Sequence, residues 1–279
     1  MLLKTVRKSD CRKIMLFTNA RDEPKINEWV AHHFLLGFDK IFIFDHLSQE
    51  PISKKINNRF GGKLVIKRID EEMSNIKLDF MKRAVNVAKV NYADWMIYLD
   101  ADEYININNC TNIKDFLKPF KEADSIGINW LMFGTSNLIN QPTSHDDLLI
   151  DNFIMSTPRL DKHVKSFVRP DRIVNIVNPH YYVMIDKSRC YNALGFIMPN
   201  GPFNIMPLPF FKSPIYIAHY YVQSENEYKR RKGRVMDDGS RPVLPSSQEI
   251  HRMYNNVSNY QLKCKYSNNI KKFLQKYNI

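Results

Sequence analysis

Short apolar runs alternate with amphipathic segments along the first half of the chain. Runs rich in aromatic and β-branched residues predict strands at residues 13–19, 40–44, 62–69, 95–99 and 125–130. Apolar side chains at helical spacing predict helices at residues 26–37, 80–93 and 112–120. Asp22, Glu23 and Pro24 are expected to supply the cap and the first turn of the first helix, and Gly37 to end it. Strands that alternate with helices predict an α/β fold, in which a mostly parallel sheet has helices on both faces.

The regular pattern is lost after about Gly134. Prolines and aromatic residues gather between Pro142 and Pro214, which indicates long loops and small accessory sheets over one edge of the main sheet. From Ser246 onward the chain has a helical and basic pattern. We therefore expect a main domain over residues 1–245, followed by a basic helical tail over residues 246–279.

The composition is that of a globular protein with a large positive charge. Of the 279 residues, 44% are hydrophobic and 25% are charged, which suits one large α/β domain or two small ones. The formal net charge of +12 favours anionic partners, and residues 228–234 form a dense basic block. The sequence has no helix-turn-helix, zinc-finger or RNA-recognition signature, so nucleic acid is not an expected partner.

Scattered cysteines and short apolar runs indicate a protein of a reducing compartment. The cysteines have neither metal-ligand spacing nor the pattern of a disulfide framework; they are Cys11, Cys110, Cys190 and Cys264. The apolar runs are too short to span a bilayer, and charges interrupt the N-terminus too early for a signal peptide. We expect a cytoplasmic protein, whose contact with any membrane would be peripheral and through its basic face.

One predicted strand ends abruptly in three carboxylates. Asp100, Asp102 and Glu103 directly follow the apolar run at residues 95–99. Open α/β sheets bind ligands at the carboxyl ends of their strands. Carboxylates that share an ion with substrate phosphates are typical ligands of Mg²⁺ and Mn²⁺. The pattern therefore predicts a divalent-cation site, with a simple acidic turn as the structural alternative.

Several motifs occur in the order that one group of enzymes has. The matching segments are residues 18–23, 27–39, 43–48, 94–104, 129–136, 165–170, His180 and residues 218–228. Among them are Glu-Trp-x-x-x-His-x-x-x-Gly, Asp-x-Asp-Glu-aromatic and Trp-x-x-Phe-Gly. In this order the chain resembles nucleotide-sugar glycosyltransferases with the GT-A fold, and more narrowly the family 2-like branch related to glycosyltransferase family 92. His46 stands where that group has Asn, and Arg21-Asp22 also depart from its usual residues.

The resemblance implies a metal-dependent transferase of the hexosyltransferase type. It implies a nucleotide-sugar donor, expected to be UDP-linked, a Mn²⁺ or Mg²⁺ cofactor, and a glycan, protein or lipid acceptor. Residues 1–134 would bind the donor and residues 135–245 the acceptor. Asp102 and Asp100 would hold the metal, Asp100 also serving the ribose, and His219 would complete the metal site. Glu103 would hold the local turn or orient a metal-bound water.

The resemblance also distributes roles among residues elsewhere in the chain. Base and ribose contacts are expected from Thr18, Asn19, Arg21, Glu23 and Asp45. Phosphate or acceptor contacts are expected from Lys165 and Arg169 and, on a closing lid, from Lys229, Arg230 and Lys232. A general base for the acceptor hydroxyl would come from Asp146, Asp147 or Asp151. Structural alternatives stay open: a turn-stabilising Asp45, a core His219 and a solvated basic helix. His32 and His33 are expected to pack within the fold and are excluded from the site.

Two other functions stay compatible with the sequence. One is another nucleotide-handling enzyme on the same core, a nucleotidyltransferase or a sugar-nucleotide hydrolase. Residues 18–23 contain no glycine, which counts against the phosphate loop of a nucleotidyltransferase. The other is a basic protein that binds nucleic acid or acidic glycan without catalysis. The sugar, the choice between inversion and retention, and the oligomeric state are not fixed by these motifs.

Overall fold

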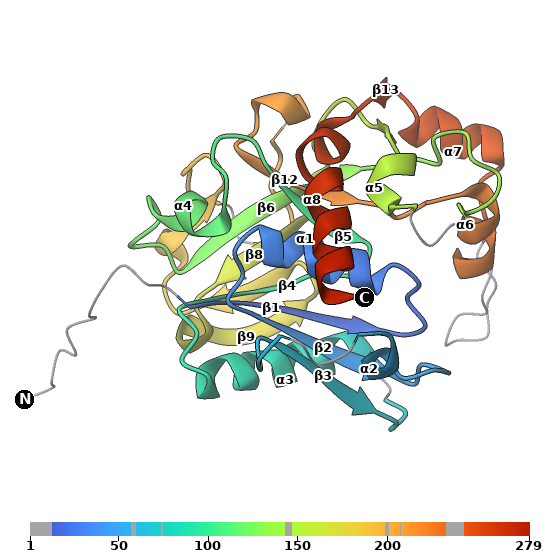
Figure 1. The fold of residues 1–279 in the computed structure, drawn as a ribbon. Coiled ribbons are helices and arrows are strands. Elements are labelled where there is room, and N and C mark those ends of the chain that lie inside the picture. Colours follow the sequence, from blue (N-terminus) through green and yellow to red (C-terminus); the bar gives the residue numbers. More distant parts are fainter. Residues whose placement is uncertain are drawn as a thin grey trace, which may run out of the picture.

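A mixed β-sheet forms the centre of the molecule (Figure 1). The computed structural model describes residues 13–56, 60–73, 75–142, 147–198, 201–206, 208–232 and 243–279. The strand order is β3-β2-β1-β4-β8-β6-β12-β5, with β11 beside β6. These strands are β1 (Ile14–Ala20), β2 (Lys40–His46), β3 (Leu64–Ile69), β4 (Trp95–Tyr98), β5 (Glu103–Ile107), β6 (Ser125–Met132), β8 (Val164–Val168), β11 (Cys190–Asn192) and β12 (Ile215–His219).

Helices and two small antiparallel strand pairs surround this sheet. The helices are α1 (Ile26–Leu35), α2 (Ile52–Lys55), α3 (Ile76–Val90), α4 (Ile113–Leu117), α5 (Leu149–Asn152), α6 (Glu225–Lys232), α7 (Ser247–Tyr254) and α8 (Gln261–Tyr277). Short 3₁₀ turns lie at Pro170–Arg172, Lys187–Arg189 and Phe210–Lys212. The small antiparallel pairs are β9 (Ile173–Asn178) with β10 (Tyr181–Met184), and β7 (Met155–Ser156) with β13 (Val257–Ser258).

The first half of the chain forms the parallel part of the sheet, as the sequence predicts. Strands β3, β2, β1 and β4 pair in parallel, and α1 and α3 connect them as crossover helices. Helix α1 ends where predicted, because Gly37 follows it with a φ of +93° and donates its N–H to the Phe34 carbonyl. The α/β prediction is confirmed by this curled sheet and its flanking helices.

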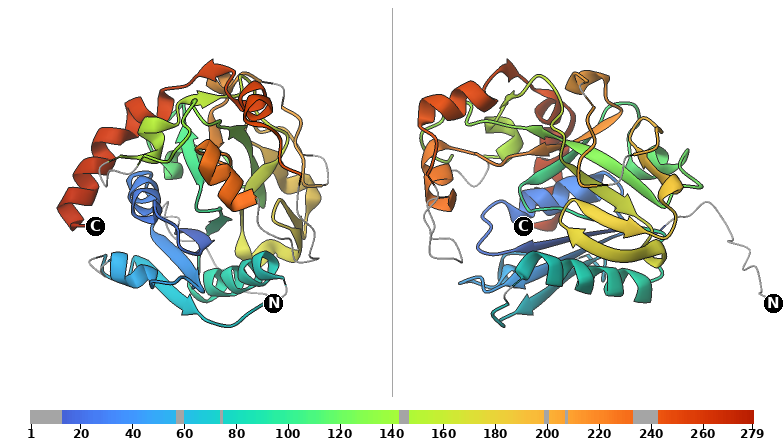
Figure 2. Two further views of the ribbon diagram at one scale, coloured as in Figure 1. Left: turned by 90° about the vertical axis from the view of Figure 1, so that its right-hand side faces the viewer. Right: turned by 180° about the vertical axis from the view of Figure 1, so that it is seen from behind.

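Alternating side chains give the sheet two buried faces. On β1, Leu16 belongs to the apolar cluster under α1 and α8, and Phe17 belongs to the cluster over α3 and the β9–β10 pair. On β2, Ile43 belongs to the first of these clusters and Phe44 to the second. Side chains alternate across a strand, so nearly continuous apolar runs indicate a sheet covered on both sides. The views in Figure 2 show α3 below the sheet and α1 above it.

The second half of the chain completes the sheet with antiparallel strands. Strand β8 lies between β4 and β6 and runs antiparallel to both, and β12 runs parallel to β6 and antiparallel to β5. Helix α8 packs against α1 and α5, with Leu262 and Ile270 fully buried. In the part of the chain that the structure describes, none of the helices is both long and apolar enough to cross a membrane.

Asp22 does not cap α1, so that prediction is wrong. The helix begins after Lys25, without a side-chain hydrogen bond at its cap. Asp22 has a φ of +50°, and its carboxylate accepts the Gln49 N–H at 2.7 Å. Its own N–H donates to the Ser48 hydroxyl oxygen at 3.0 Å. The residue therefore joins the loop after β1 to the loop after β2.

Candidate active site

The acidic segment lies where strands β4, β5 and β12 meet. Asp100 and Asp102 occupy the turn between β4 and β5, and His219 at the end of β12 is the register partner of Glu103. Glu103 closes this turn, because its carboxylate accepts the Asp100 N–H at 2.9 Å. Glu103 therefore holds the local turn, which is one of the two roles expected for it. Strand β12 brings His219 to the same edge of the sheet.

Two lysines neutralise Asp100. The ammonium of Lys165, which is 1% exposed, lies 2.9 Å from the Asp100 carboxylate, and Lys77 of α3 bonds to its other oxygen. Burial would raise the pKa of Asp100, but these two cations outweigh burial and hold it well below its usual range. Asp100 is therefore an anion at every physiological pH.

Asp102 faces a second set of partners. Its carboxylate accepts a hydrogen bond from Arg231 of α6 at 2.5 Å, and the His219 Nε2 lies 3.6 Å from its other oxygen. His219 packs against the Trp130 ring at 4.2 Å, and burial lowers its pKa to about 4. Its Nδ1 is buried and has no hydrogen-bond partner among the residues that the structure describes. His219 is therefore neutral near pH 7, and its imidazole can serve as a ligand.

Asn19 and Glu23 lie beside the two carboxylates. The Asn19 side-chain oxygen accepts hydrogen bonds from Lys77 and from the Tyr98 hydroxyl, each at 2.9 Å. Burial raises the pKa of Glu23 to about 7; the negative charge of Asp102 adds to this effect and Arg231 opposes it. The loop after β1 therefore contributes one amide and one readily protonated carboxyl to the same edge.

The structure shows no hydrogen bond or ion pair between the Asp100 carboxylate and the other described residues that are predicted to contact the base and ribose. Thr18 is fully buried within β1, and Arg21 is exposed on the loop that follows. Asp45 is also fully buried, and its carboxylate accepts the Ile52 N–H at the start of α2 at 2.9 Å. This contact matches the structural alternative, in which Asp45 stabilises a turn.

Helix α6 brings a cation to the site, but not one of those chosen from the sequence. Lys229 is exposed, Arg230 pairs with Glu227 one turn away, and the side chain of Lys232 lies outside the described residues. Arg231 is the residue that reaches Asp102. Helical spacing could have identified Arg231, because it follows the buried Tyr228 by three positions and therefore lies on the same face of the helix.

Lys77 is the second site residue that the sequence motifs miss. The helix predicted at residues 80–93 begins earlier, at Ile76. Lys77 stands three and four positions before Phe80 and Met81, which are both buried. Extending the helical pattern by one turn would have placed this ammonium on the inward face of α3.

The structure does not bring Arg169 to the Asp100 and Asp102 carboxylates. Strand β8 runs antiparallel to β4, which puts Lys165 and Arg169 at opposite edges of the sheet. Arg169 donates hydrogen bonds to the Ala123 and Lys121 carbonyls, both at 2.7 Å, and its guanidinium covers the Trp95 ring at 4.4 Å. It therefore stabilises the start of β4 and β6.

The candidate general bases that the structure describes, Asp147 and Asp151, have different surroundings. Asp146 lies outside the described residues. Asp151 is on α5 and pairs with Lys271 of α8 at 2.7 Å, so the structure does not bring it to Asp102. Asp147 lines a cavity of about 480 Å³ together with Glu227 and Arg230. This cavity also includes Asp22, Pro24 and Lys25, the chain neighbours of Glu23.

The carboxylates are not gathered into a ready-made metal cage. Within the described ranges, no group of three or more His, Cys, Asp or Glu side chains is arranged to hold a metal ion. Asp102 and His219 form a pair of an oxygen and a nitrogen ligand, whereas Asp100 faces lysines. Any ion at Asp102 would need further ligands from its substrate or from water.

This fold and site define an α/β protein with a charged ligand site at the carboxyl ends of its strands. The family model of glycosyltransferase family 92 matches residues 11–193, which is more than half of the chain. The chain belongs to glycosyltransferase family 92.

Curated relatives carry the same family name. A glycosyltransferase family 92 protein of Ricinus communis is 24% identical over 232 residues, covering 79% of this chain and 41% of that protein. One from Oryza sativa subsp. japonica is 22% identical over 279 residues, covering 96% of this chain and 44% of that protein. The chain therefore spans about two fifths of the length of these relatives.

Among solved structures, HddC from Yersinia pseudotuberculosis overlaps with a TM-score of 0.38 and 12% identity. The overlap covers 63% of this chain and 84% of that one. This likeness is too low to support a functional argument, so the family assignment rests on the sequence matches.

Proposed function

We propose that the protein is a metal-dependent glycosyltransferase that takes a sugar from a UDP-sugar and transfers it to a hydroxyl of a glycan, protein or lipid. The observation that carries this proposal is the Asp102–His219–Arg231 group at the carboxyl edge of the sheet. The family supports sugar transfer, and the edge of the sheet is where such folds bind nucleotides.

The charges at this edge suit a diphosphate leaving group. Cleavage of the sugar–phosphate bond increases the negative charge on the diphosphate, which preorganised cations stabilise. Lys77, Lys165 and Arg231 are all bonded to carboxylates of the site, so their positions are set before a donor arrives. Asp100 in this proposal orients the two ammonium groups.

Asp102 and His219 would hold the divalent cation, for which their donor atoms fit. A carboxylate oxygen and a neutral imidazole nitrogen suit Mn²⁺, and Mg²⁺ is commonly bound through one or two carboxylates with substrate phosphates. The His219 Nε2 faces Asp102, and its Nδ1 has no hydrogen-bond partner among the described residues. When bound, the ion would act as a Lewis acid on the diphosphate.

The cavity beside α6 is the proposed acceptor site. Its lining residues flank both Glu23 and Arg231 in the chain, so it opens next to the donor edge. Of the predicted bases that the structure describes, Asp147 is the one that lines this cavity. An acceptor hydroxyl bound there would need one carboxylate to take its proton.

Calorimetry with nucleotides tests the donor site. Wild-type protein is titrated with UDP, GDP and several UDP-sugars, each with Mn²⁺ and with chelator. We expect binding of a uridine nucleotide that weakens at least about tenfold in chelator, and an equal loss in Asp102→Asn, because the ligand carboxylate is removed. Asp79→Asn is the matched control, since Asp79 is exposed on α3 and lies 3.9 Å from Lys82.

Product analysis separates the proposed activity from its alternatives. A transferase releases UDP, whereas a sugar-nucleotide hydrolase that cleaves the diphosphate releases UMP and a sugar phosphate. Nucleotide binding that is insensitive to chelator would contradict the metal-dependent part of the proposal. Failure of the wild-type protein to bind any nucleotide, with or without metal, would refute it and favour a basic binding protein.

A further inference from the structure

One long segment of this highly charged chain carries no charge at all. The protein has 41 Lys and Arg and 29 Asp and Glu residues, yet none lies between Cys190 and Phe211. Lys187 and Arg189 precede this uncharged segment and Lys212 follows it. Large apolar side chains are mostly buried in globular proteins, so a contiguous group of exposed ones within this segment needs an explanation.

The turn after β11 presents apolar side chains to the solvent on a backbone with several internal hydrogen bonds. Leu194, Phe196 and Ile197 are 41%, 66% and 63% exposed. The buried Asn192 side chain accepts the N–H groups of Leu194 and Phe196, at 2.9 and 3.1 Å. The Asn192 N–H also donates to the Phe196 carbonyl at 2.8 Å. The turn is thus held by its own hydrogen bonds and does not depend on water for these groups.

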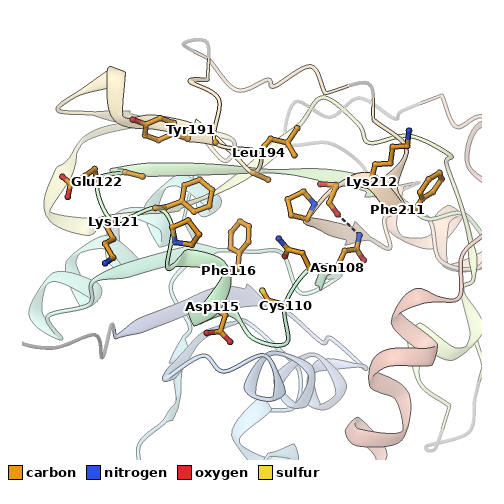
Figure 3. Close-up of a pocket in the computed structure, with 18 residues that line it drawn as sticks. Asn108, Cys110, Asp115, Phe116, Lys121, Glu122, Tyr191, Leu194, Phe211 and Lys212 are labelled. Carbon is orange, nitrogen blue, oxygen red and sulfur yellow. Dashed lines mark hydrogen bonds between the residues drawn. The ribbon is translucent and has the colours of Figure 1, made fainter.

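A second exposed aromatic residue adjoins the same turn. Phe211, which is 60% exposed, lines a cavity of about 960 Å³ together with Tyr191 and Leu194. Figure 3 shows Leu194 and Phe211 along one side of this cavity, with Lys212 next to Phe211. The cavity includes Pro214, directly before β12, whereas His219 lies at the far end of that strand. This apolar surface is therefore separate from the carboxylate site.

We propose that the apolar surface formed by Leu194, Phe196, Ile197 and Phe211 docks on an anionic lipid bilayer. Insertion into the interface is favoured by apolar side chains and by backbone groups that already have partners, and the turn after β11 has exposed apolar side chains and bonded N–H groups at Leu194 and Phe196. Lys187 and Lys212 are exposed at the two ends of the uncharged segment, where they can meet lipid phosphates.

Charge favours a lipid surface over a second copy of the chain. Asp115 and Glu122 balance Lys121 and Lys212 around the cavity, but the whole chain has a formal net charge of +12. Two copies would repel one another, whereas an anionic bilayer attracts each of them. Peripheral binding of this kind needs no membrane-spanning helix.

Vesicle co-sedimentation tests the proposal. The protein is mixed with vesicles of phosphatidylcholine alone, or of phosphatidylcholine with phosphatidylserine. We expect binding to the anionic vesicles that falls at least about tenfold in Phe196→Ser/Ile197→Ser, because the inserted side chains are lost. Lys187→Gln/Lys212→Gln should weaken binding to the anionic vesicles and leave any binding to neutral vesicles unchanged.

The matched control is Ile76→Ser/Val90→Ser on α3. These two side chains are also exposed, at 38% and 77%, but they lie outside the uncharged segment. Unchanged melting temperatures show that each variant is folded. The proposal is overturned if the wild-type protein ignores anionic vesicles or if the control loses binding equally. It is also overturned if Phe196→Ser/Ile197→Ser abolishes a dimer seen by analytical ultracentrifugation, which would assign the surface to a second copy.

Discussion

At the scale of single residues, the contact between Arg231 and Asp102 joins α6 to the edge of the sheet. Asp102 is 6% exposed, so its carboxylate has lost most of its water and depends on protein partners. The Arg231 guanidinium is one of these partners, and its side chain is 25% exposed. Removing it leaves a nearly buried anion without its strongest hydrogen bond.

Arg231→Gln should destabilise the protein by about 1–3 kcal/mol, because one partner of a partly buried charge pair is removed. Urea unfolding at neutral pH measures this change. Arg230→Gln is the control, since Arg230 is exposed and pairs with Glu227 within the same helix. Its effect should stay below about 0.5 kcal/mol. Equal effects of the two substitutions would contradict the importance of the Arg231–Asp102 contact.

The residues of the site differ in how far the sequence could predict them. Asp100 and Asp102 follow a strand directly, so local pattern and motif both indicate them. Lys165 and His219 lie in motifs that are distant in the chain. They arrive at the same edge because β8 and β12 both pair with β6. Lys77 lies outside the matched motifs, and Arg231 is one of several cations in the basic block at residues 228–234. Each of the two residues reaches the site because it lies on the inward face of its helix.

At the scale of elements, α5 shows how one side chain can begin a helix from a distance. This four-residue helix has no side-chain cap from its own N-cap residue. The buried Glu28 of α1 replaces such a cap, because its carboxylate accepts the N–H groups of Leu149 and Ile150, at 2.7 and 3.2 Å. The loop on the acceptor side is thereby attached to the parallel half of the sheet.

Glu28→Ala should cost about 2–4 kcal/mol of unfolding free energy, because two buried N–H groups lose their acceptor. Thermal and urea unfolding both measure this loss. Glu50→Ala provides the comparison, since Glu50 is exposed, and it should change stability by less than about 0.5 kcal/mol. A small effect of Glu28→Ala would show that α5 forms without this cap.

Strands with a local apolar run were predictable, and strands defined by distant partners were not. Strands β1 to β4 and β6 have apolar runs that identify them without any partner. Strand β5 escaped notice because its first residue, Glu103, belongs to the acidic motif, and its partner β12 lies more than a hundred residues away. The position of β8 between β4 and β6 is likewise a long-range property that no local pattern contains.

At the scale of the whole molecule, buried histidines make stability depend on pH. Burial lowers the pKa of His32, His180 and His219 to about 4, and that of His33 well below its usual value. The Nε2 of His32 lies 2.8 Å from the Ile105 carbonyl, and the Nδ1 of His33 lies 2.8 Å from the Trp29 carbonyl. Both histidines pack within the core, as the sequence suggested.

The wild-type protein should lose stability as the pH falls from about 6.5 toward 4. The unfolded chain binds protons on these histidines near pH 6.5, whereas folded His32 does so only near 4. The stabilisation is therefore complete above the unfolded pKa and is lost toward the folded pKa, by up to about 2 kcal/mol for His32 between pH 7 and pH 5. Urea unfolding at several pH values in this range should show that the unfolding free energy of the wild type depends more steeply on pH than that of His32→Gln.

Glu23 and Glu28 change the stability with pH in the direction opposite to that of the histidines. The comparison with His32→Gln is therefore needed to separate the two effects. Burial raises the pKa of both from 4.5 to about 7, so their stabilisation is complete below 4.5 and is lost as the pH rises through 7. Both variants in the comparison retain these glutamates, so the difference between the slopes isolates His32. An equal pH dependence of the two proteins would show that folding leaves the pKa of His32 unchanged.

The position of β8 also has a consequence for how the chain is made. Strands β1 to β4 are complete by Tyr98, but β4 then has an open edge until Val164–Val168 is synthesised. Val168 is the β8 residue that pairs with β4, so the ribosome must add about 70 further residues before this edge is covered, which takes several seconds at typical elongation rates. An open, apolar edge can pair with any extended chain nearby. During the interval between β4 and β8 this edge of the nascent protein is therefore open to pairing with other chains.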